Sequence, residues 1–395
     1  MQHRPMRIAV VGGGPGGLYL ASLWKDRHPR DEVELFEQSP ADATWGFGVV
    51  FSDRALEFLR EDDPVTGNLI APHMESWRNI TVVHRGERIV IDGIGFSAIG
   101  RLVLLRLLQQ RAHTVGVVCR FKTPIRAIDE LTGFDLIVAA DGVNSPMRRA
   151  YEGDFGFSLS YLTNKFIWYG TTRHFETLTQ TFAQTDVGNF NAHHYRYAPA
   201  MSTFLIECDR STWLRAGFDR LSEEETRRYC ERIFEQTLQG EELVSNRSTW
   251  RNFPWVWNDR WWFRNVVLVG DALRTAHFSI GSGTRLALED ALALVKALEA
   301  EPADLGSALA RYENDRRPIV EKLVAASRRS ALWYERFAEH MRLAPLDLAM
   351  SYITRSERID EDRLQAMSPG FMSLYAGARN APKIGGPSRE QDHAG

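Results

Sequence analysis

Cysteine is scarce in this chain of 395 residues. The three cysteines, Cys119, Cys208 and Cys230, lie far apart and form no CxxC pair. This spacing excludes a disulfide-stapled scaffold and a zinc ribbon. We therefore expect reduced thiols and no bound metal.

Long hydrophobic runs and a strong net charge are also missing. The longest apolar runs, such as residues 266–269, fall far short of the roughly 20 residues that a membrane span needs. The first residues lack the apolar core and cleavage site of a signal peptide, so we expect a cytoplasmic protein without membrane contact. A formal charge of −3 argues against a nucleic-acid partner, which would require a basic excess.

Lysine is rare as well, because six lysines stand against 42 arginines. Guanidinium groups bind phosphate through paired hydrogen bonds, so the arginines could serve a phosphate-rich ligand. Codon bias would produce the same excess, and both explanations stay open. The remaining composition, 44% apolar and 25% charged, is that of an ordinary globular protein with one to three domains.

A glycine-rich turn stands near the start of the chain. Residues 12–17 read GGGPGG and satisfy the pattern G-x-G-x-x-G with Gly12, Gly14 and Gly17. Gly12 permits a tight turn, Gly14 lets the backbone approach a pyrophosphate, and Gly17 lets a helix pack closely on a strand.

The context of this turn makes the pattern meaningful. An apolar strand is predicted at residues 7–11, a helix at 18–27 and a second strand at 33–37. Glu37 ends the second strand, 20 residues after the last motif glycine. A carboxylate at that place accepts both hydroxyls of an adenosine ribose.

Two further segments place aspartate and glycine directly after a buried strand. Asp141 and Gly142 follow a strand predicted at 134–140, and Gly270 and Asp271 follow one at 265–269. Ligands bind at the carboxyl ends of strands in open α/β sheets. We therefore expect these two segments and the glycine turn to meet at one site.

The segments between and after these motifs are predicted to form different kinds of secondary structure. We predict a loop at 44–52, a helix at 101–112, an antiparallel sheet within 164–208, and a helix from Ser222 with Glu225 in a capping box. A helix is predicted at 284–298, followed by a helical stretch at 304–337 that is interrupted at Pro318.

Taken together, the three motif segments resemble the FAD motifs of the single-component FAD-dependent aromatic hydroxylases, which share the para-hydroxybenzoate hydroxylase fold. The resemblance extends to about residue 340. It implies that the glycine turn and Glu37 hold the ADP half of FAD. It also implies that Arg101 contacts the cofactor near its pyrophosphate, that Asp141 and Gly142 lie near that pyrophosphate, and that Asp271 binds the ribityl chain. The same resemblance assigns cofactor binding to Pro15, Gly16, Gly48, Val49, Gly270, Gly281, Gly283 and Thr284.

Five segments are similar to one branch of this family. The branch contains salicylyl-CoA 5-hydroxylase, 2-aminobenzoyl-CoA monooxygenase/reductase and the tryptophan hydroxylase of violacein biosynthesis. The string HFSIGSGT at 277–284 is the most specific of the five, because most relatives outside the branch have prolines at its first two positions. The other four segments are residues 46–53, 164–171, 202–208 and 250–253.

Two positions depart from the family pattern. Arg274 stands where histidine is usual, and Arg285 stands where asparagine is usual. Arg274 would lie near the dinucleotide and could assist phosphate binding. Arg285 would lie on the helix beside the flavin ring, so the ring could be placed differently.

The resemblance implies an α/β (α+β overall) fold in which a Rossmann-like FAD-binding domain is interleaved with a mostly antiparallel substrate sheet. The FAD-binding part would comprise residues 1–75, 98–163 and 264–340. The substrate sheet would comprise 76–97 and 164–263. A helical segment at 341–377 and a loose tail at 378–395 would complete the chain.

The activity implied is ring hydroxylation with NADH or NADPH, dioxygen and a C4a-hydroperoxyflavin. The preferred substrate is an aryl-CoA thioester, with conversion of salicylyl-CoA to gentisyl-CoA as the first choice. The alternatives are hydroxylation of tryptophan or another indole and, in a different class, an FAD-binding reductase without oxygenation. A homodimer is allowed but not required.

The substrate is expected between the flavin and the inserted sheet. His193, Tyr195, Trp168 and His277 are the candidate lining residues, and His193, Tyr195 and His277 are the candidate catalytic groups. His277 precedes the flavin-facing loop and could bind a peroxide or a phenol. A purely structural histidine is an equal alternative.

Overall fold

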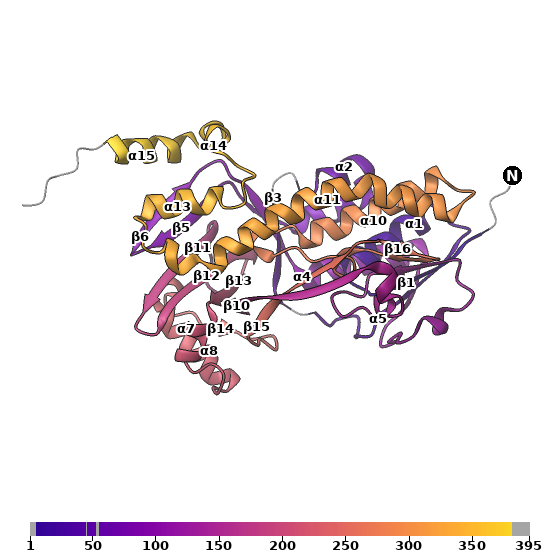
Figure 1. Cartoon of the computed structure of the whole chain (residues 1–395), viewed down its shortest axis with the longest axis horizontal. Coiled ribbons are helices and arrows are strands. Elements are labelled where there is room, and N and C mark those ends of the chain that lie inside the picture. The colour runs from indigo at the N-terminus through magenta and orange to yellow at the C-terminus, as the bar shows by residue number, and fades with distance from the viewer. Residues whose placement is uncertain (1–4, 45, 53–54, 381–395) are drawn as a thin grey trace, which may run out of the picture.

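The computed structural model describes residues 5–44, 46–52 and 55–380. Three sheets organise these residues, and two long helices, α10 and α11, run across the molecule beside them (Figure 1). The predicted tail at 378–395 falls outside the described residues from 381 onward, and residues 378–380 belong to the last helix. No helix in the described part of the chain is long and apolar enough to cross a membrane.

The first sheet is parallel except at one edge, and its inner strands are largely buried on both faces. Its apolar Val, Ile and Leu runs fit this position, since helices cover both faces of such sheets. In spatial order its strands are β16 (Trp262–Phe263), β17 (Val266–Leu268), β9 (Leu136–Ala139), β1 (Arg7–Val11), β2 (Glu32–Phe36) and β8 (Val118–Arg120).

The helices beside this sheet pack against one another in a row. Helix α1 (Pro15–Arg27) contacts both α4 (Arg101–Val115) and α10 (Gly283–Ala300), and α10 contacts α11 (Leu305–Glu335). The shorter elements nearby are α2 (Glu57–Asp62), α3 (Pro64–Ile70), α5 (Pro146–Arg149), α6 (Glu152–Phe155), η1 (Ala71–His73), η2 (Ile128–Leu131), η3 (Gly270–Ala272) and η4 (Phe278–Ile280).

The second sheet is mostly antiparallel, as the sequence predicted. Its strands are, in spatial order, β14 (Leu243–Val244), β10 (Phe157–Thr171), β13 (Met201–Cys208), β12 (Gly188–Ala198), β11 (Leu178–Thr185), β5 (Ile80–His84) and β6 (Glu87–Ile91), with β15 (Arg251–Asn258) paired to β10. One face carries apolar side chains under α7 (Arg210–Arg215), α8 (Glu223–Ile233) and α9 (Glu235–Leu238). The opposite face holds several buried polar side chains, including His193 and Glu207.

The predicted loop at 44–52 is in part a strand. Residues Gly48–Ser52 form β3, which pairs antiparallel with β7 (Phe96–Gly100), and β4 (Glu75–Trp77) completes a three-stranded sheet. The loop prediction was wrong here because the pairing partner lies almost fifty residues away in the chain. The glycine at the start of β3 suits its position, since a Cβ on Gly48 would lie 2.5 Å from the Cβ of Tyr197.

The predicted interruption at Pro318 is also wrong, because α11 continues through this proline as one helix of 31 residues. A proline removes one backbone hydrogen bond and crowds the preceding turn. The buried residues Leu309, Tyr312, Val320 and Val324 pack on the core on either side of it and hold the helix together. Figure 1 shows α11 extending from the parallel sheet to the antiparallel one.

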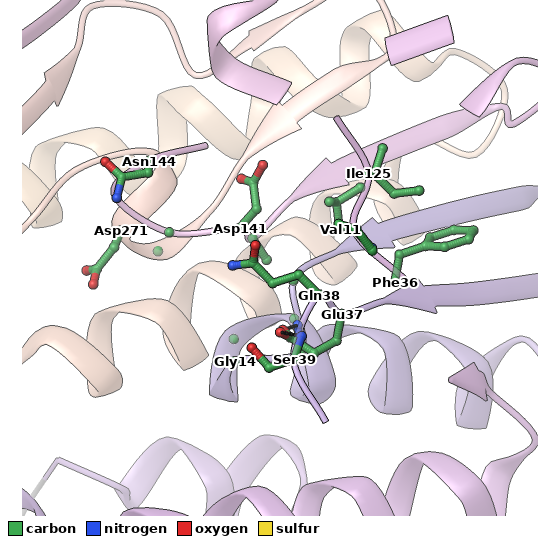
Figure 2. Close-up of a pocket in the computed structure, with 18 of the residues that line it drawn as sticks. Val11, Gly14, Phe36, Glu37, Gln38, Ser39, Ile125, Asp141, Asn144 and Asp271 are labelled. Carbon is green, nitrogen blue, oxygen red and sulfur yellow. Dashed lines mark hydrogen bonds between the residues drawn. The ribbon is translucent and has the colours of Figure 1, made fainter. Parts of the chain in front are cut away.

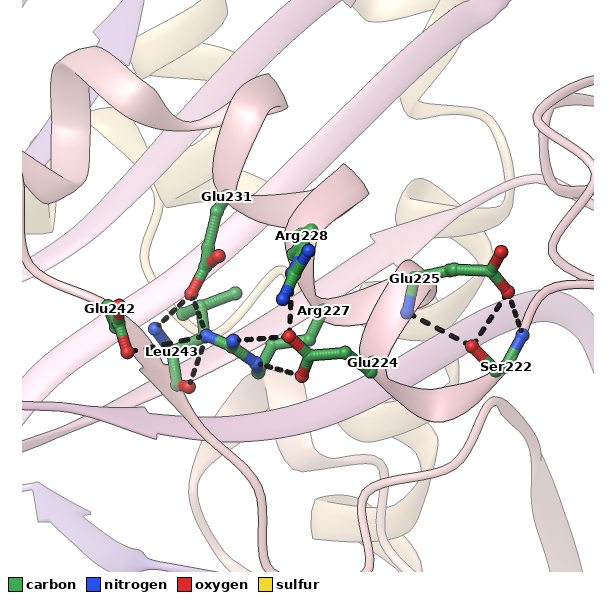
Figure 3. A network of polar contacts seen from close by, with 8 residues as sticks. All are labelled: Ser222, Glu224, Glu225, Arg227, Arg228, Glu231, Glu242 and Leu243. Atoms are coloured by element: carbon green, nitrogen blue, oxygen red, sulfur yellow. Dashed lines mark hydrogen bonds and ion pairs between the residues drawn. The ribbon is translucent and has the colours of Figure 1, made fainter.

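The predicted capping box at the start of α8 is confirmed. The Ser222 Oγ accepts from the backbone N–H of Glu225, and the Glu225 carboxylate accepts from Ser222 (Figure 3). Farther along the helix, Arg227 pairs with Glu224 and Glu231. The carboxylate of Glu224 is half exposed, so its pair with Arg227 contributes little stability.

The last helices pack at the far edge of the second sheet. Their apolar faces form a separate core with β5 and β6. These helices are α12 (Phe337–His340), α13 (Pro345–Thr354), α14 (Glu361–Met367) and α15 (Pro369–Asn380). The α/β fold class predicted from the sequence is confirmed.

Candidate active site

A cleft of about 1060 Å³ lies at the carboxyl edge of the parallel sheet. This volume lies just above the range of about 300–1,000 Å³ that small-molecule sites usually occupy, as suits a large cofactor. Figure 2 shows Glu37, Asp141 and Asp271, from three separate segments, around this cleft. The structure brings together thirteen of the predicted cofactor residues in its lining: Gly12, Gly14, Pro15, Gly16, Gly17, Glu37, Arg101, Asp141, Gly142, Gly270, Asp271, Gly283 and Thr284.

The glycine turn has no room for a side chain at two of its three motif positions. A Cβ on Gly12, whose φ is +109°, would lie 2.2 Å from the Ala140 carbonyl oxygen. A Cβ on Gly17 would lie 2.1 Å from the Gly12 carbonyl oxygen. At Gly14, in contrast, nothing lies within 4 Å. The backbone N–H groups at the start of α1 are therefore open to a ligand, which is the arrangement that suits a pyrophosphate.

Glu37 is held at the cleft by the backbone. Its Oε2 accepts from the N–H of Gly13 at 2.7 Å, and its Oε1 accepts from the N–H of Ser39 at 2.7 Å. Each carboxylate oxygen can accept more than one hydrogen bond. Glu37 is therefore fixed and can still accept from the hydroxyls of a ribose.

Arg101 brings an unpaired cation to the same cleft. Its guanidinium makes no hydrogen bond or ion pair with any described residue. Burial lowers the pKa of Arg101 and raises that of Asp271, and the attraction between the two opposite charges partly offsets both shifts. A half-buried charge without a partner is costly, so this guanidinium suits an anionic ligand such as a pyrophosphate.

Asp141 presents an unused acceptor. Its Oδ2 accepts from the N–H of Met147 at 3.3 Å, whereas its buried Oδ1 has no hydrogen-bond partner among the described residues. Burial raises the pKa of Asp141 to about 6, against the opposing hydrogen bonds from Ser145 and Met147. Asp141 therefore leaves one acceptor unsatisfied in the wall of the cleft.

Three predicted cofactor residues, Gly48, Val49 and Gly281, do not line this cleft. A Cβ on Gly281 would lie 3.0 Å from a methyl group of Val50, so β3 meets the loop that leads into α10. That loop continues to Gly283, which does line the cleft. The three residues therefore lie next to the cleft end formed by the start of α10.

The candidate catalytic histidines lie together in a separate buried cluster. The ring of Tyr334 is centred 4.9 Å from that of His193 and 6.1 Å from that of His277, and Phe278 packs on both histidines. Burial lowers the pKa of both, that of His277 to about 3, with a further contribution from Arg355. Both imidazoles are therefore neutral at pH 7.

The two aromatic candidates occupy structural positions beside this cluster. The Tyr195 hydroxyl donates to the Gly48 carbonyl oxygen at 3.0 Å and thereby ties β12 to β3. Burial raises the pKa of Tyr195, which keeps the hydroxyl protonated. The ring of Trp168 lies where a Cβ on Gly46 would approach it to 2.7 Å. None of the four lining candidates borders the cleft of the glycine turn.

Glu207 belongs to the same cluster and was missed from the sequence. It is 2% exposed, and its Oε1 accepts from the Asn164 side chain at 2.8 Å. Its Oε2 lies 3.7 Å from His193 Nε2, and neither atom has a hydrogen-bond partner among the described residues. Burial raises the pKa of Glu207 to about 8, which places a protonated carboxyl beside a neutral imidazole at pH 7. A single acid within the apolar string FLIEC was the signal that could have revealed it.

Comparison with known proteins agrees with this geometry. A family model described as "FAD binding domain" matches residues 103–327. Salicyloyl-CoA 5-hydroxylase of a Streptomyces species is 41% identical over 361 residues, which are 89% of this chain and 70% of the relative. The chain belongs to the FAD binding domain family. It is a flavoprotein monooxygenase of the aromatic hydroxylase branch, so the predicted family and enzyme class are confirmed.

Further relatives support the same assignment. A 3-hydroxy-4-methyl-anthranilyl-(aryl-carrier protein) 5-monooxygenase of Streptosporangium sibiricum is 38% identical over 335 residues, covering 85% of this chain and 90% of the relative. Protodeoxyviolaceinate monooxygenase of Chromobacterium violaceum is 33% identical over 365 residues, covering 90% and 95%. The fold matches that of 2-methyl-3-hydroxypyridine-5-carboxylic acid oxygenase with a TM-score of 0.71 at 18% identity, covering 92% of this chain and 96% of that one.

The expectation that Arg274 assists phosphate binding in this flavoprotein is wrong. Arg274 is 2% exposed and does not line the cleft, because its guanidinium pairs with the buried Asp290 at 2.6 Å and donates to the Gly270 carbonyl oxygen at 2.9 Å. Asp290 also accepts from the Gly270 N–H and from Arg316. Arg274 and Asp290 therefore hold the backbone of Gly270, which belongs to the Gly270–Asp271 motif, on the side away from the cleft.

The second departure, Arg285, points away from the FAD cleft of the flavoprotein. Its Nε pairs with Glu289 at 2.7 Å, and both side chains line a second groove of about 540 Å³ between α10 and α11. Thr284 and Ala287, on another face of the same helix, line the FAD cleft. The expectation that Arg285 alters the placement of the flavin ring gains no support from this position.

Many arginines of this flavoprotein form ion pairs with carboxylates of the protein itself, among them Arg227, Arg274 and Arg316. Among the described residues, three arginines line the FAD cleft: Arg101, Arg126 and Arg149. The arginine excess is thus only partly explained by the cofactor site. No group of three or more His, Cys, Asp or Glu side chains in the described part of the chain could hold a metal ion.

Proposed function

We propose that this flavoprotein hydroxylates the ring of an aryl-CoA thioester, with salicyloyl-CoA as the first candidate. The observation that carries this proposal is the agreement between two relatives at 41% and 38% identity. Both names describe an aromatic acyl group on a carrier, with a hydroxyl or an amino group ortho to the acyl carbon. Both also describe oxygenation at ring position 5, which is para to that electron-donating group.

The cleft residues fit the cofactor part of this reaction. The glycine turn, Glu37 and Arg101 would hold the ADP half and the pyrophosphate of FAD, and Asp271 would hold the ribityl chain. Bound FAD, reduced by NADH or NADPH, supplies the activation of dioxygen for ring hydroxylation. The start of α10 at Gly283 would add the partial positive charge of a helix N-terminus at the flavin end of the cleft.

We further assign the substrate to the polar face of the antiparallel sheet, in keeping with the domain division expected from the sequence. The buried cluster of His193, His277 and Glu207 lies on this face and next to the loop that leads into α10. It offers hydrogen-bonding groups in an otherwise aromatic surrounding. Such a site suits a ring that bears a phenol or an amine.

A cluster of arginines near α10 suits the phosphates of CoA. Arg358 has no acidic partner among the described residues, and burial, together with the neighbouring charges of Arg285 and Arg363, lowers its pKa. Arg363 also donates to the Arg358 carbonyl oxygen at 3.2 Å. Arg285 is paired with Glu289, so Arg358 and Arg363 are the guanidinium groups without an acidic partner among the described residues, and a bound phosphate would stabilise them. Arg358→Ala is therefore expected to raise KM for salicyloyl-CoA about 10-fold and to leave KM for salicyloyl-pantetheine, which lacks the nucleotide, unchanged.

The test is a screen of NADH and NADPH oxidation by the FAD-loaded enzyme with salicyloyl-CoA, anthraniloyl-CoA, benzoyl-CoA and tryptophan, combined with mass analysis of the products. Salicyloyl-CoA should accelerate oxidation and gain one oxygen para to its hydroxyl group. Benzoyl-CoA is the matched control, because it has the carrier but no ortho donor, and it should yield little hydroxylated product. A hydroxylated product from tryptophan alone would overturn the thioester proposal.

The second candidate is hydroxylation of an indole. It rests on the relative named protodeoxyviolaceinate monooxygenase, at 33% identity. The same screen decides between the two candidates. The cytoplasmic location and the homodimer stay predictions.

A further inference from the structure

A continuous hydrogen-bonded chain of side chains connects the C-terminal helices to His277. The Arg355 Nε donates to the Ser330 Oγ at 3.0 Å, the Ser330 Oγ lies 2.7 Å from the Ser279 Oγ, and the Ser279 Oγ lies 2.8 Å from the His277 Nδ1. Ser330 belongs to α11, Ser279 to η4, and Arg355 follows α13. The chain therefore joins three separate segments behind the loop that enters α10.

Arg355 is itself rigidly held. Its Nη2 donates to the Ser279 carbonyl oxygen at 2.7 Å, and its Nη1 donates to the Tyr352 carbonyl oxygen at 2.5 Å. Its guanidinium carbon also lies 3.9 Å from the centre of the Tyr352 ring. A guanidinium group donates hydrogen bonds and accepts none, so this end of the chain has a fixed polarity.

That polarity determines the direction of every bond in the chain. Because Ser330 accepts from Arg355, its own proton points to Ser279, and the Ser279 proton then points to His277 Nδ1. The opposite direction would leave the Ser330 proton without an acceptor among the described residues. It would also place a proton on Nδ1 against the backbone N–H of Ser279, which approaches this nitrogen at 3.4 Å. His277 Nδ1 is thus an acceptor, and the ring proton is on Nε2.

The other nitrogen of the imidazole, Nε2, is unpaired within the described part of the chain, in a side chain that is 2% exposed. His277 Nε2 has no hydrogen-bond partner among the described residues, and the ring packs against Phe253, Phe278 and Tyr334. Burial and Arg355 both disfavour a second proton on the ring. A neutral imidazole with a fixed tautomer can donate from Nε2 but cannot act as a base there.

We propose that Arg355, acting through Ser330 and Ser279, fixes His277 as the neutral Nε2–H tautomer, and that this N–H donates a hydrogen bond to an oxygen of the aromatic substrate. Arg355 and the two serines are positioning residues, and His277 is the group that touches the substrate. A donor to the phenol oxygen stabilises the phenolate, which is the more electron-rich form of the ring. The substrate half of this inference rests on the proposed function, and the tautomer half does not.

The tautomer is tested on the FAD-loaded enzyme without substrate. Nitrogen-15 NMR of histidine-labelled protein distinguishes Nε2–H from Nδ1–H, and His277→Gln identifies the signal by its loss. The wild-type signal should show the neutral Nε2–H form without titration between pH 6 and pH 9. Ser330→Ala, which removes one oxygen from a buried site, should convert the signal into a mixture of tautomers.

Ser327→Ala is the matched control for this measurement. Ser327 lies one turn away on the same helix and accepts from the backbone N–H of His277 at 2.7 Å, but it does not touch the ring. Its substitution should leave the tautomer unchanged. An Nδ1–H signal in the wild type, or equal spectra for Ser330→Ala and the wild type, would overturn the assignment.

The donor role is tested by the yield of hydroxylated product per NADH or NADPH consumed with salicyloyl-CoA. His277→Leu should lower this yield at least about 10-fold, whereas His277→Gln, which keeps an N–H donor, should retain most of it. Equal losses in the two variants would overturn the donor role. If no substrate is hydroxylated by the wild type, the proposed function fails while the NMR result on the tautomer still stands.

Discussion

Alanine substitutions at two glycines of the same turn should separate folding from FAD binding. At Gly17, a Cβ would lie 2.1 Å from the Gly12 carbonyl oxygen and 3.2 Å from the Cβ of Ala140. Real Cβ contacts stay beyond 3.0 Å, so α1 would have to move away from β1 by about 1 Å. Both elements are part of the largest apolar core, which is too densely packed to absorb such a shift.

The expected loss is large for Gly17→Ala. Overpacking of a core costs about 1–3 kcal/mol, and more where backbone must move, so we expect unfolding to become easier by about 3 kcal/mol or more. Gly14→Ala is the matched variant, because nothing lies within 4 Å of its Cβ and its φ of −73° and ψ of 175° are open to alanine. Its unfolding free energy should change by less than about 0.5 kcal/mol.

Gly14→Ala should weaken FAD binding even though it leaves the stability of the fold nearly unchanged. The methyl group of Gly14→Ala would occupy the space through which a pyrophosphate approaches the start of α1, so FAD affinity should fall about 10- to 100-fold, or about 1.4–2.7 kcal/mol. Chemical denaturation of the apo-protein and titration with FAD, followed by flavin fluorescence, give the two quantities. Wild-type FAD affinity in Gly14→Ala, or equal destabilisation of the apo-protein by both variants, would refute this reasoning.

Three further predictions concern stability. Asp290→Asn should destabilise the fold by about 3–5 kcal/mol in chemical denaturation, because it leaves Arg274 without its buried counter-charge, while Arg316 keeps its pair with Glu289; Glu32→Gln, in an exposed pair, should change it by less than about 1 kcal/mol. The folded protein holds a proton on Glu207 that the unfolded chain releases, so the unfolding free energy should fall as pH rises from 4.5 to about 8. Glu207→Gln should flatten this dependence in a pH series of melts, and an unchanged slope would contradict the raised pKa. Ser222→Ala should cost about 1 kcal/mol through loss of the helix cap, measured by denaturation, and a neutral result would show that the cap adds nothing.

Features that depend on neighbouring residues could be predicted from the sequence. The glycine turn is one example, since Gly12 and Gly17 are required by contacts within a single strand–turn–helix unit and its adjoining strand. The capping box of Ser222 and Glu225 is another, because both partners lie in one helical turn. Parallel strand topology then brings the segments of Asp141 and Asp271 to the same edge, as the motifs implied.

Features that depend on distant partners could not be predicted. Gly48–Ser52 becomes a strand only through pairing with Phe96–Gly100, and Pro318 remains inside a helix only through the core contacts on either side of it. The charge of Arg274 suggests that it binds a ligand, but in the structure its guanidinium forms an ion pair with the buried Asp290.

The sequence by itself determined the family, the cofactor and most residues of the FAD cleft, because these follow from short motifs with a fixed spacing. Only the tertiary structure placed His193 beside Glu207 and connected His277 to Arg355, since these residues come from separate elements. Burial then decided their protonation, through the removal of water that no local sequence pattern specifies.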